Sequence, residues 1–369
     1  MSEQEGWSVQ SHEQRRDALV ERVFGSCIAF MEILSIYVGD RLGFYRALAD
    51  DGGATASQLA DATGTHERYA REWLEQQAVA SLLEVEDADV GPEERRYRLP
   101  EGHSEALLER NSLYYVAPLA RQMVGLTRPL PAVLEAYRTG GGVPYSEYGE
   151  DIREGVAYAN RTQFVNLMGS EWLPAVPDVH ERLQADPPAR VADVGCGTGW
   201  SSISIARAYP KARVDGFDLD EAPIAEAKAN AEAEGLTDQV SFQIRDAADP
   251  ELSGRYDVAI AIECIHDMSR PVEALRAMRS ITRADGAVLI VDERVREEFT
   301  APSDEIERLM YSFSILHCLP VGMAEQPSAG TGTVMRSATL RRYATEAGFS
   351  GVEVLPIEND LWRFYRLVS

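Results

Sequence analysis

The spacing of apolar residues predicts a long helix near the N-terminus. Between Arg15 and Leu42, apolar side chains recur at every third or fourth position, which is the period of an amphipathic helix. The stripe consists of Leu19, Val20, Val23, Phe24, Cys27, Ile28, Met31, Leu34 and Val38. Because so broad an apolar stripe is unfavourable in water, we expect this helix to have a partner surface.

The segment from about Arg41 to Pro100 has the pattern of a winged helix. A first helix leads into a Gly/Thr turn, a second helix opens at Thr55 or Ser57, and a third ends near Ala80. The strand-like sequences SLLEVE and RRYRLP flank DADVGPEE, which predicts the hairpin of a wing.

The charges on this segment oppose DNA binding. A winged helix reads DNA with its third helix and its wing. Here the third helix carries Glu67, Arg68, Arg71, Glu72 and Glu75, and the wing carries Glu84, Glu86, Asp87, Asp89, Glu93 and Glu94. The whole chain has 36 Lys and Arg against 60 Asp and Glu, a net charge of −24. We therefore expect a dimerisation module, and neither nucleic acid nor an anionic membrane as a partner.

Residues 104–185 are mainly helical in pattern, apart from an aromatic loop, TGGGVPYSEYGED, whose glycines and proline interrupt the helices. After DPPA at 186–189, strand-like runs alternate with helical ones, which predicts a doubly wound parallel α/β sheet. The pattern suggests three regions: an N-terminal helix with a winged helix (1–100), a helical linker that roofs the active site (101–187), and a ligand-binding domain (188–369). Within the last, 294–337 is too long for an ordinary connection and is expected to form a substrate lid.

The sequence VADVGCGTGW marks a ligand site at the end of the first strand. Gly195, Gly197 and Gly199 let backbone pass close to a ligand. A dinucleotide-binding fingerprint needs a glycine where this chain has Trp200, and GxxxxGK[ST] occurs nowhere. The pattern therefore favours a nucleoside ligand without phosphate.

Acidic residues at successive strand ends favour a cationic nucleoside. Asp193 lies beside the glycine turn and suits an ammonium or sulfonium group. Asp218 ends the second strand, where it is placed to accept both ribose hydroxyls, and Asp246 follows the third, where it is placed to accept from an adenine amino group. Asp220 is either a further contact or a helix N-cap. The expected site also includes Leu219, Ala247, Glu263 and Tyr148; Glu263 is either a cofactor contact or a solvated strand end.

These motifs resemble the class I S-adenosylmethionine-dependent methyltransferases. The match comprises ADVGCGTGW, GFDLD, RDAAD, YDVAIAIECIHDM, ADGAVLIVDE and the closing hairpin of LRRYATEAGFSGVEVLP and LWRFYRLV. The resemblance implies a Rossmann-like seven-stranded sheet in the order 3-2-1-4-5-7-6, with S-adenosyl-L-methionine as cofactor. The winged helix resembles that of small-molecule O-methyltransferases, in which it dimerises and roofs the site. The GGGVPY and LHCLPV segments are similar to a bacterial group typified by uncharacterised mycobacterial methyltransferases.

The resemblance suggests His266 in ECIHDMSRP as a general base for a hydroxyl acceptor. The family usually has His-Asp-Trp here, with an acidic partner further along the loop, whereas this chain has Met268 and then Ser-Arg-Pro. The alternative is that His266 only orders the loop. Asp267 either orients the imidazole or, more in keeping with its position, caps the following helix.

Aromatic residues suggest how the site is covered. The lid segment contributes Tyr311 and His317, and the aromatic loop contributes Tyr145 and Tyr148, which close over the cofactor or pack between domains. Cys264, His266, His317 and Cys318 are zinc-type ligands, but their spacing matches no zinc template, so no metal is predicted. The four cysteines are expected to be reduced thiols.

Taken together, the sequence predicts a cytoplasmic, homodimeric enzyme that moves a methyl group to a small aromatic or polycyclic molecule, preferably at oxygen. No apolar run reaches the roughly 20 residues of a membrane span, and MSEQEGWSVQSHEQRRD lacks a secretory layout. Two alternatives remain: a non-catalytic winged-helix regulator that binds S-adenosylmethionine, and a methyltransferase-fold enzyme that uses this cofactor for other chemistry.

Overall fold

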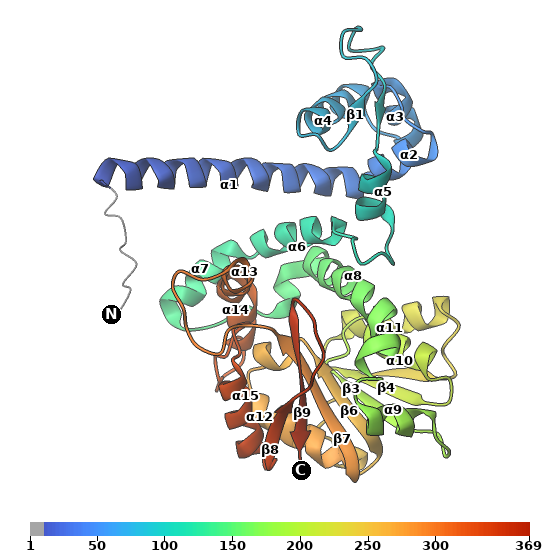
Figure 1. The fold of residues 1–369 in the computed structure, drawn as a ribbon, viewed down its shortest axis with the longest axis vertical. Coiled ribbons are helices and arrows are strands. Elements are labelled where there is room, and N and C mark those ends of the chain that lie inside the picture. Colours follow the sequence, from blue (N-terminus) through green and yellow to red (C-terminus); the bar gives the residue numbers. More distant parts are fainter. Residues whose placement is uncertain (1–10) are drawn as a thin grey trace, which may run out of the picture. The chain divides into compact units, whose positions relative to one another are not determined.

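The computed structural model describes residues 11–369 (Figure 1). The prediction that there is no secretory leader rests on MSEQEGWSVQSHEQRRD, and most of this segment lies outside the described residues. The chain divides into two compact units, one reaching Glu109 and including Tyr114–Val124, the other formed by Arg110–Leu113 and Gly125–Ser369. None of the described helices is long and apolar enough to cross a membrane.

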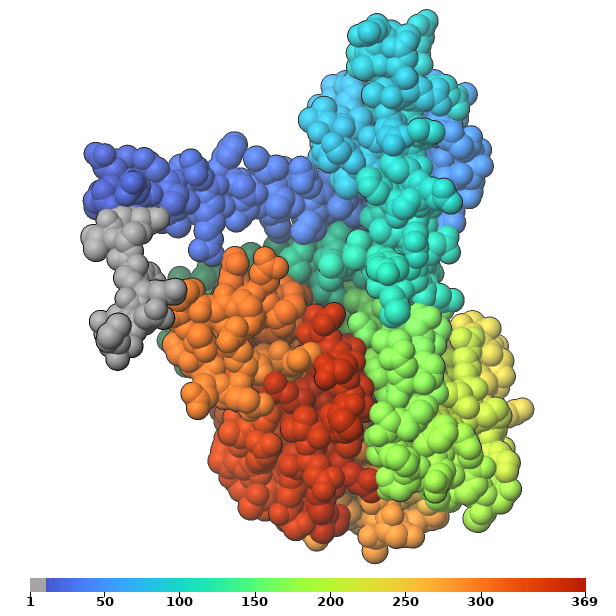
Figure 2. Space-filling model, in the orientation of Figure 1, coloured from blue at the N-terminus to red at the C-terminus, as the bar shows by residue number. Residues whose placement is uncertain are grey.

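The first unit begins with the expected long helix, α1 (His12–Arg41). Ser11 and Gln14 form a capping box at its start, in which each side chain accepts from the other's backbone N–H. The apolar stripe is present but mostly exposed along the first five turns, and Figure 2 draws these turns in dark blue. Near its C-terminal end, α1 packs on α4 (Glu67–Val79), where Trp73 Nε1 donates to Ser35 O at 2.9 Å.

The winged helix is confirmed by the remaining elements of this unit. Thr55 caps its second helix, and a positive-φ glycine, Gly64, ends that helix. The wing strands are only two residues each and pair antiparallel. The elements are α2 (Phe44–Asp50), α3 (Ala56–Thr63), β1 (Glu84–Val85), β2 (Tyr97–Arg98) and α5 (Glu101–Leu108).

The second unit contains the predicted sheet (Figure 1). Its strands lie in the order β5-β4-β3-β6-β7-β9-β8, which is 3-2-1-4-5-7-6 in chain order and confirms the expected topology. Strands β3 to β7 pair in parallel, and β9 pairs antiparallel with both β7 and β8. The strands are β3 (Arg190–Val194), β4 (Arg213–Asp218), β5 (Val240–Ile244), β6 (Tyr256–Ile262), β7 (Thr282–Glu293), β8 (Gly351–Val354) and β9 (Trp362–Val368).

Helices cover both faces of the sheet, because each face carries apolar side chains that must leave water. One apolar cluster joins the sheet to α9 (Pro177–Gln184), α10 (Trp200–Ala208) and α11 (Glu221–Ala233). The other joins it to α12 (Pro271–Ile281) and α15 (Ser337–Ala347). The short turns η3 (Pro250–Leu252) and η4 (Ile265–Asp267) flank β6.

The segment before the sheet is helical, as expected, with one correction. Its elements are α6 (Ala117–Thr127), α7 (Leu130–Thr139), η1 (Tyr145–Tyr148), α8 (Gly149–Leu167) and the π-helical turn η2 (Met168–Trp172). The aromatic loop is therefore shorter than predicted, because residues 149–151 already belong to α8. Glu150 and Asp151 stand in the first turn of that helix, where negative charge is favourable.

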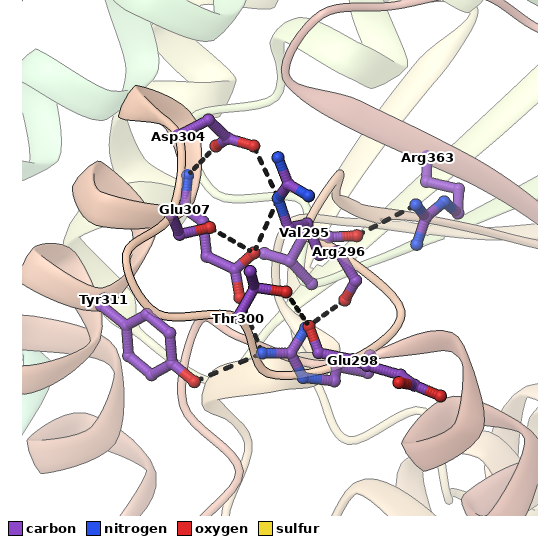
Figure 3. Close-up of polar contacts among 10 residues, drawn as sticks. Val295, Arg296, Glu298, Thr300, Asp304, Glu307, Tyr311 and Arg363 are labelled. Carbon is purple, nitrogen blue, oxygen red and sulfur yellow. Dashed lines mark hydrogen bonds and ion pairs between the residues drawn. The ribbon is translucent and has the colours of Figure 1, made fainter. Parts of the chain in front are cut away.

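Residues 294–337 form a helical insertion with α13 (Glu305–Phe313), the π-helical turn η5 (Ser314–Cys318) and α14 (Leu319–Gly322). Figure 3 shows the polar contacts at its base. The Glu307 side chain, 1% exposed, accepts from Arg336 Nη2 at 2.7 Å and lies 3.8 Å from Arg296 Nε. Because these arginines stand near opposite ends of the insertion, Glu307 ties the two ends together.

Candidate active site

The turn after β3 needs its glycines. Gly195, Gly197 and Gly199 have φ angles of 72°, 51° and 83°, a region that favours glycine. A side chain on Gly199 would begin 2.5 Å from the ring of Phe242. The turn is held to the sheet, because the Gly195 N–H donates to Phe217 O at 2.8 Å.

Asp218, the last residue of β4, is attached to this turn. Its carboxylate accepts from the backbone N–H of Gly197 and of Asp220, both at 3.0 Å. Burial raises the pKa of Asp218 above its ordinary value, while these hydrogen bonds oppose the shift. Asp220 occupies the N-cap position of α11, but its side chain makes no capping hydrogen bond.

The side chain of Asp193 is deeply buried. Its carboxylate accepts from the hydroxyls of Ser201 and Ser202, at 2.5 and 2.6 Å, which fixes β3 to the first turn of α10. Burial raises the pKa of Asp193 above its ordinary value. Its contact with a cationic ligand stays a prediction.

The other predicted nucleoside contacts lie at the same sheet edge, because β4 and β5 are parallel neighbours. Leu219 is 71% exposed after β4. Beyond β5, Asp246 is exposed and accepts from the Ala248 N–H at 2.8 Å, while Ala247 is buried. The position of all three is compatible with the base and ribose of a nucleoside.

His266 lies in η4, just beyond the end of β6, and is buried. Its Nδ1 is 2.9 Å from Oδ1 of Asp292 on β7. Sequence reasoning missed Asp292, since it sought an acid in the loop after His266. The signal was available in VLIVDE, because neighbouring parallel strands bring their carboxyl ends to one edge.

The charge of His266 follows from its partners. Burial by itself lowers the pKa of His266, but the Asp292 carboxylate and the Cys318 thiol raise it well above its ordinary value. Burial raises the pKa of neighbouring Asp267 to about 7. Asp267 is not the predicted helix cap: the N-cap of α12 is Arg270, because Pro271 occupies the first position of that helix.

The insertion and the aromatic loop meet at His317. The rings of Tyr145 and Tyr148 lie edge-on to this imidazole, with centroids 5.6 and 4.6 Å away. The Tyr148 hydroxyl donates to Leu316 O at 2.7 Å. Tyr145 is near enough to both Asp218 and Asp267 for burial and these charges to raise its pKa. The aromatic loop therefore extends from Asp218 to His317.

Tyr311 belongs to a different group of contacts. It is 38% exposed on α13, and its hydroxyl accepts from Arg336 Nη2 at 3.3 Å. Figure 3 shows Tyr311 with the dashed line from this hydroxyl. This hydrogen bond places it in the Glu307 network rather than with His317. Its predicted contact with substrate rests on the sequence alone.

Glu263 is not the solvated strand end that was one of its two interpretations. It has a positive φ of 50°, and its carboxylate accepts from Trp362 Nε1 at 2.6 Å and from Asn160 Nδ2. Burial raises the pKa of Glu263, and burial with the Glu263 charge raises the pKa of adjacent Glu293 well above its ordinary value. The charge of Glu263 therefore disfavours ionisation of Glu293.

Comparison with known proteins adds to this geometry. Residues 185–336 match the family described as "Methyltransferase domain", and residues 29–110 match "Rv2258c-like winged HTH domain". Ajmaline N-methyltransferase of Rauvolfia serpentina is 30% identical over 119 residues, which are 32% of this chain and 40% of that protein. The chain thus spans less than half of this curated relative.

Solved structures match over nearly the whole chain. The mitomycin 7-O-methyltransferase MmcR has a TM-score of 0.69 at 20% identity, covering 96% of this chain and 98% of its own. Human N-acetylserotonin methyltransferase, in complex with SAM, has a TM-score of 0.66 at 18% identity, covering 98% and 99%. At these identities the likeness to the solved structures concerns the fold alone. The methyltransferase resemblance expected from the motifs is confirmed by the family match over residues 185–336.

Proposed function

We propose that this protein, which carries a methyltransferase domain after an Rv2258c-like winged helix-turn-helix domain, transfers a methyl group from S-adenosylmethionine to a small molecule. One observation carries the proposal. The positive-φ glycine turn after β3 donates the Gly197 N–H to Asp218 at the end of β4. In doubly wound sheets a nucleoside binds at such a turn with its ribose on the acid.

The residues around the turn fit an S-adenosylmethionine cation. Asp218 presents a carboxylate for the ribose hydroxyls, and exposed Asp246 suits the adenine amino group. A carboxylate at this position attracts a cationic ligand and would repel a pyrophosphate. When bound, this cofactor supplies an activated methyl group, so the protein's task is to position the acceptor and exclude water.

The buried His266–Asp292 pair favours oxygen as the acceptor atom. A hydroxyl must lose its proton as the methyl group is transferred, and the neutral imidazole of His266, which forms above its raised pKa, can accept that proton. The rings of Tyr145, Tyr148 and His317 favour an aromatic or polycyclic acceptor beside them.

We further infer a cytoplasmic homodimer without a nucleic-acid partner. The exposed apolar stripe of α1 supports self-association, and the acidic wing opposes DNA binding. The four cysteines form no disulfide within residues 11–369, as is usual for proteins of a reducing compartment.

Calorimetry with S-adenosylhomocysteine tests the cofactor, and a methyl-labelled donor tests the transfer. We expect a saturable heat of binding and a weaker affinity in Asp218→Ala. Asp186 is exposed and paired with Lys211, so Asp186→Ala should leave the affinity unchanged. Lack of heat at about 1 mM ligand, the range of the weakest specific binding, would contradict the proposal. Binding without label in any product would instead favour a regulatory protein or other chemistry.

A further inference from the structure

His317 has a buried ring nitrogen without a hydrogen-bond partner. Its side chain lies in the π-helical turn η5 and is 6% exposed. Nδ1 of His317 is 3.4 Å from the Cys318 sulfur, whereas Nε2 has no hydrogen-bond partner within residues 11–369. Buried polar atoms in folded proteins are nearly always paired, so this nitrogen requires an explanation. His266, rather than His317, is the proposed base, and proton transfer to His266 does not use this atom.

Neighbouring rings hold the His317 imidazole in one orientation. The rings of Tyr145 and Tyr148 lie edge-on to it, at interplanar angles of 74° and 73°. The aromatic loop that carries both tyrosines is itself bound to the insertion, where the Val143 N–H donates to Pro320 O at 2.9 Å. The direction of Nε2 is therefore fixed before any ligand arrives, which favours binding of a polar group in one position.

The insertion also packs against the loop that carries His266. The Ser269 hydroxyl donates to Gly322 O at 2.8 Å, and a Cβ on Gly322 would lie 3.2 Å from Asp267 O. Gly322 ends α14, which directly follows the turn that carries His317. His317 and the proposed base therefore belong to segments that are packed together.

We propose that Nε2 of His317 binds a second hydroxyl group of the acceptor, so that this enzyme selects aromatic molecules with at least two hydroxyls. The inference rests on the proposed function, in which His266 takes the proton of the hydroxyl that is methylated. The aromatic ring of the acceptor packs beside Tyr145 and Tyr148, and His317 recognises the hydroxyl that is not methylated.

A hydroxyl fits this nitrogen in either tautomer of the imidazole. The Cys318 thiol can donate to Nδ1 or accept from it, so that Nε2 carries a proton in the first case and a lone pair in the second. A hydroxyl both donates and accepts, whereas a carbonyl only accepts and an ammonium only donates.

The surroundings of His317 disfavour an anionic substituent. In the part of the chain that the structure describes, its side-chain hydrogen bond and ring contacts are with a thiol and two tyrosines. None of these groups is a cation, so a carboxylate bound here would be buried without a counter-charge. The neutral hydroxyl is the substituent that this environment accepts.

Selectivity follows from the cost of leaving Nε2 unpaired. An acceptor without the second hydroxyl covers this nitrogen with an apolar ring and offers it no hydrogen bond. Sites built to bind a substrate hydroxyl reject the analogue that lacks it. For one hydrogen bond with a buried partner, we expect a preference of about tenfold or more.

Calorimetry tests the proposal without methyl transfer. The probes are the dihydroxybenzenes and dihydroxynaphthalenes, with phenol and the naphthols as matched single-hydroxyl compounds, each added to protein saturated with S-adenosylhomocysteine. We expect at least one diol to bind about tenfold or more tightly than its matched compound. His317→Phe keeps a ring beside Tyr145 and Tyr148 but removes Nε2, so it should abolish this preference by weakening the binding of the diol.

Two further variants separate recognition from packing. His317→Gln places an amide near the position of Nε2 and should restore part of the preference. Tyr137→Phe is the matched control, because exposed Tyr137 donates to Ile315 O in the same turn at 3.2 Å, and its preference should equal that of the wild type. An equal preference in His317→Phe and wild type, or no binding of any diol to the wild type, would overturn the proposal.

The fold of His317→Phe is checked by its affinity for S-adenosylhomocysteine, which should be unchanged. If this variant does not fold, NMR of the wild type with isotope-labelled histidine decides the question. The Nε2 signal of His317, assigned by its absence in His317→Gln, should shift with the diol and not with the single-hydroxyl compound. A signal that responds to neither compound would overturn the proposal.

The proposed function and this inference fail in different ways. If the diol binds with the expected preference but receives no methyl group from a labelled donor, the proposed function fails and the role of His317 in binding stands. If the wild type methylates phenol or a naphthol with the same kcat/KM as the matched diols, the proposed function stands and His317 does not select the acceptor.

Discussion

The side chains of His266 and Asp218 are held in place by different kinds of group. The imidazole of His266 is fixed by Asp292, which lies on the adjacent strand. Asp218 is fixed by backbone N–H groups of the glycine turn and of the first residues after β4. A change at His266 should therefore alter a proton transfer, and a change at Asp218 should alter ligand binding.

Replacing His266 with Gln should lower turnover on a hydroxyl acceptor by roughly a hundredfold or more, the range expected for loss of a general base. Gln keeps a polar group near Asp292 but takes no proton, so affinity for S-adenosylhomocysteine should be retained. Steady-state kinetics and calorimetry measure the two effects separately. Turnover equal to that of the wild type would reduce His266 to a residue that orders its loop.

Replacing Asp218 with Ala should weaken cofactor binding by about 1.5–3 kcal/mol for each charge-assisted hydrogen bond lost. Asp218→Asn keeps acceptor capacity for Gly197 and should fall between Ala and wild type. Calorimetry with S-adenosylhomocysteine measures both variants. Full affinity in Asp218→Ala would mean that the ribose lies elsewhere.

Among the elements, the insertion after β7 has the greatest influence on the site. It carries His317 and Cys318 in a π-helical turn, directly after the amphipathic helix α13. Its base is held by Glu307, which binds Arg336 and lies near Arg296. The position of the thiol therefore depends on a salt bridge remote from it in sequence.

Glu307→Ala should loosen the insertion, because it leaves Arg336 partly buried without its carboxylate. Loss of one partner from a buried ion pair costs about 3–5 kcal/mol. Hydrogen exchange should become faster over residues 305–318, and the unfolding midpoint should fall. Glu325→Ala, which removes an exposed partner of Arg270 in the same insertion, should cost at most about 1 kcal/mol. Equal effects of the two variants would contradict the role given to Glu307.

At the scale of the whole molecule, the exposed apolar stripe of α1 is a feature that one copy of the chain does not account for. Phe24 is 68% exposed, and several further apolar residues of this helix are also exposed. Burying such side chains gains roughly 1.5–3 kcal/mol each. A second copy of the chain would supply the partner surface that the sequence pattern requires.

Phe24→Asp should therefore shift the protein from dimer to monomer in sedimentation experiments. A carboxylate on the stripe would have to be buried in the dimer without a partner, which is costly. Arg22→Gln, on the opposite face of α1 by its spacing, should leave the dimer intact. A wild-type monomer at micromolar concentration would refute this assembly.

The sequence alone determined the local structures and the edge of the sheet where ligands bind. The period of apolar residues located α1 and the strands, and glycines with a following acid located the turn and Asp218, since these signals act over a few neighbouring residues. The motif resemblance supplied the strand order, which spacing alone does not define.

Only the tertiary structure decided which distant groups meet. Asp292 of β7 meets His266 of the loop after β6, and Tyr148 of η1 meets His317 of the insertion, and these contacts depend on how the elements pack. The buried Glu263–Glu293 pair and the helical start at Gly149 were likewise missed. Burial and long-range contact set the protonation of such groups, and neither is encoded in the spacing of residues along the chain.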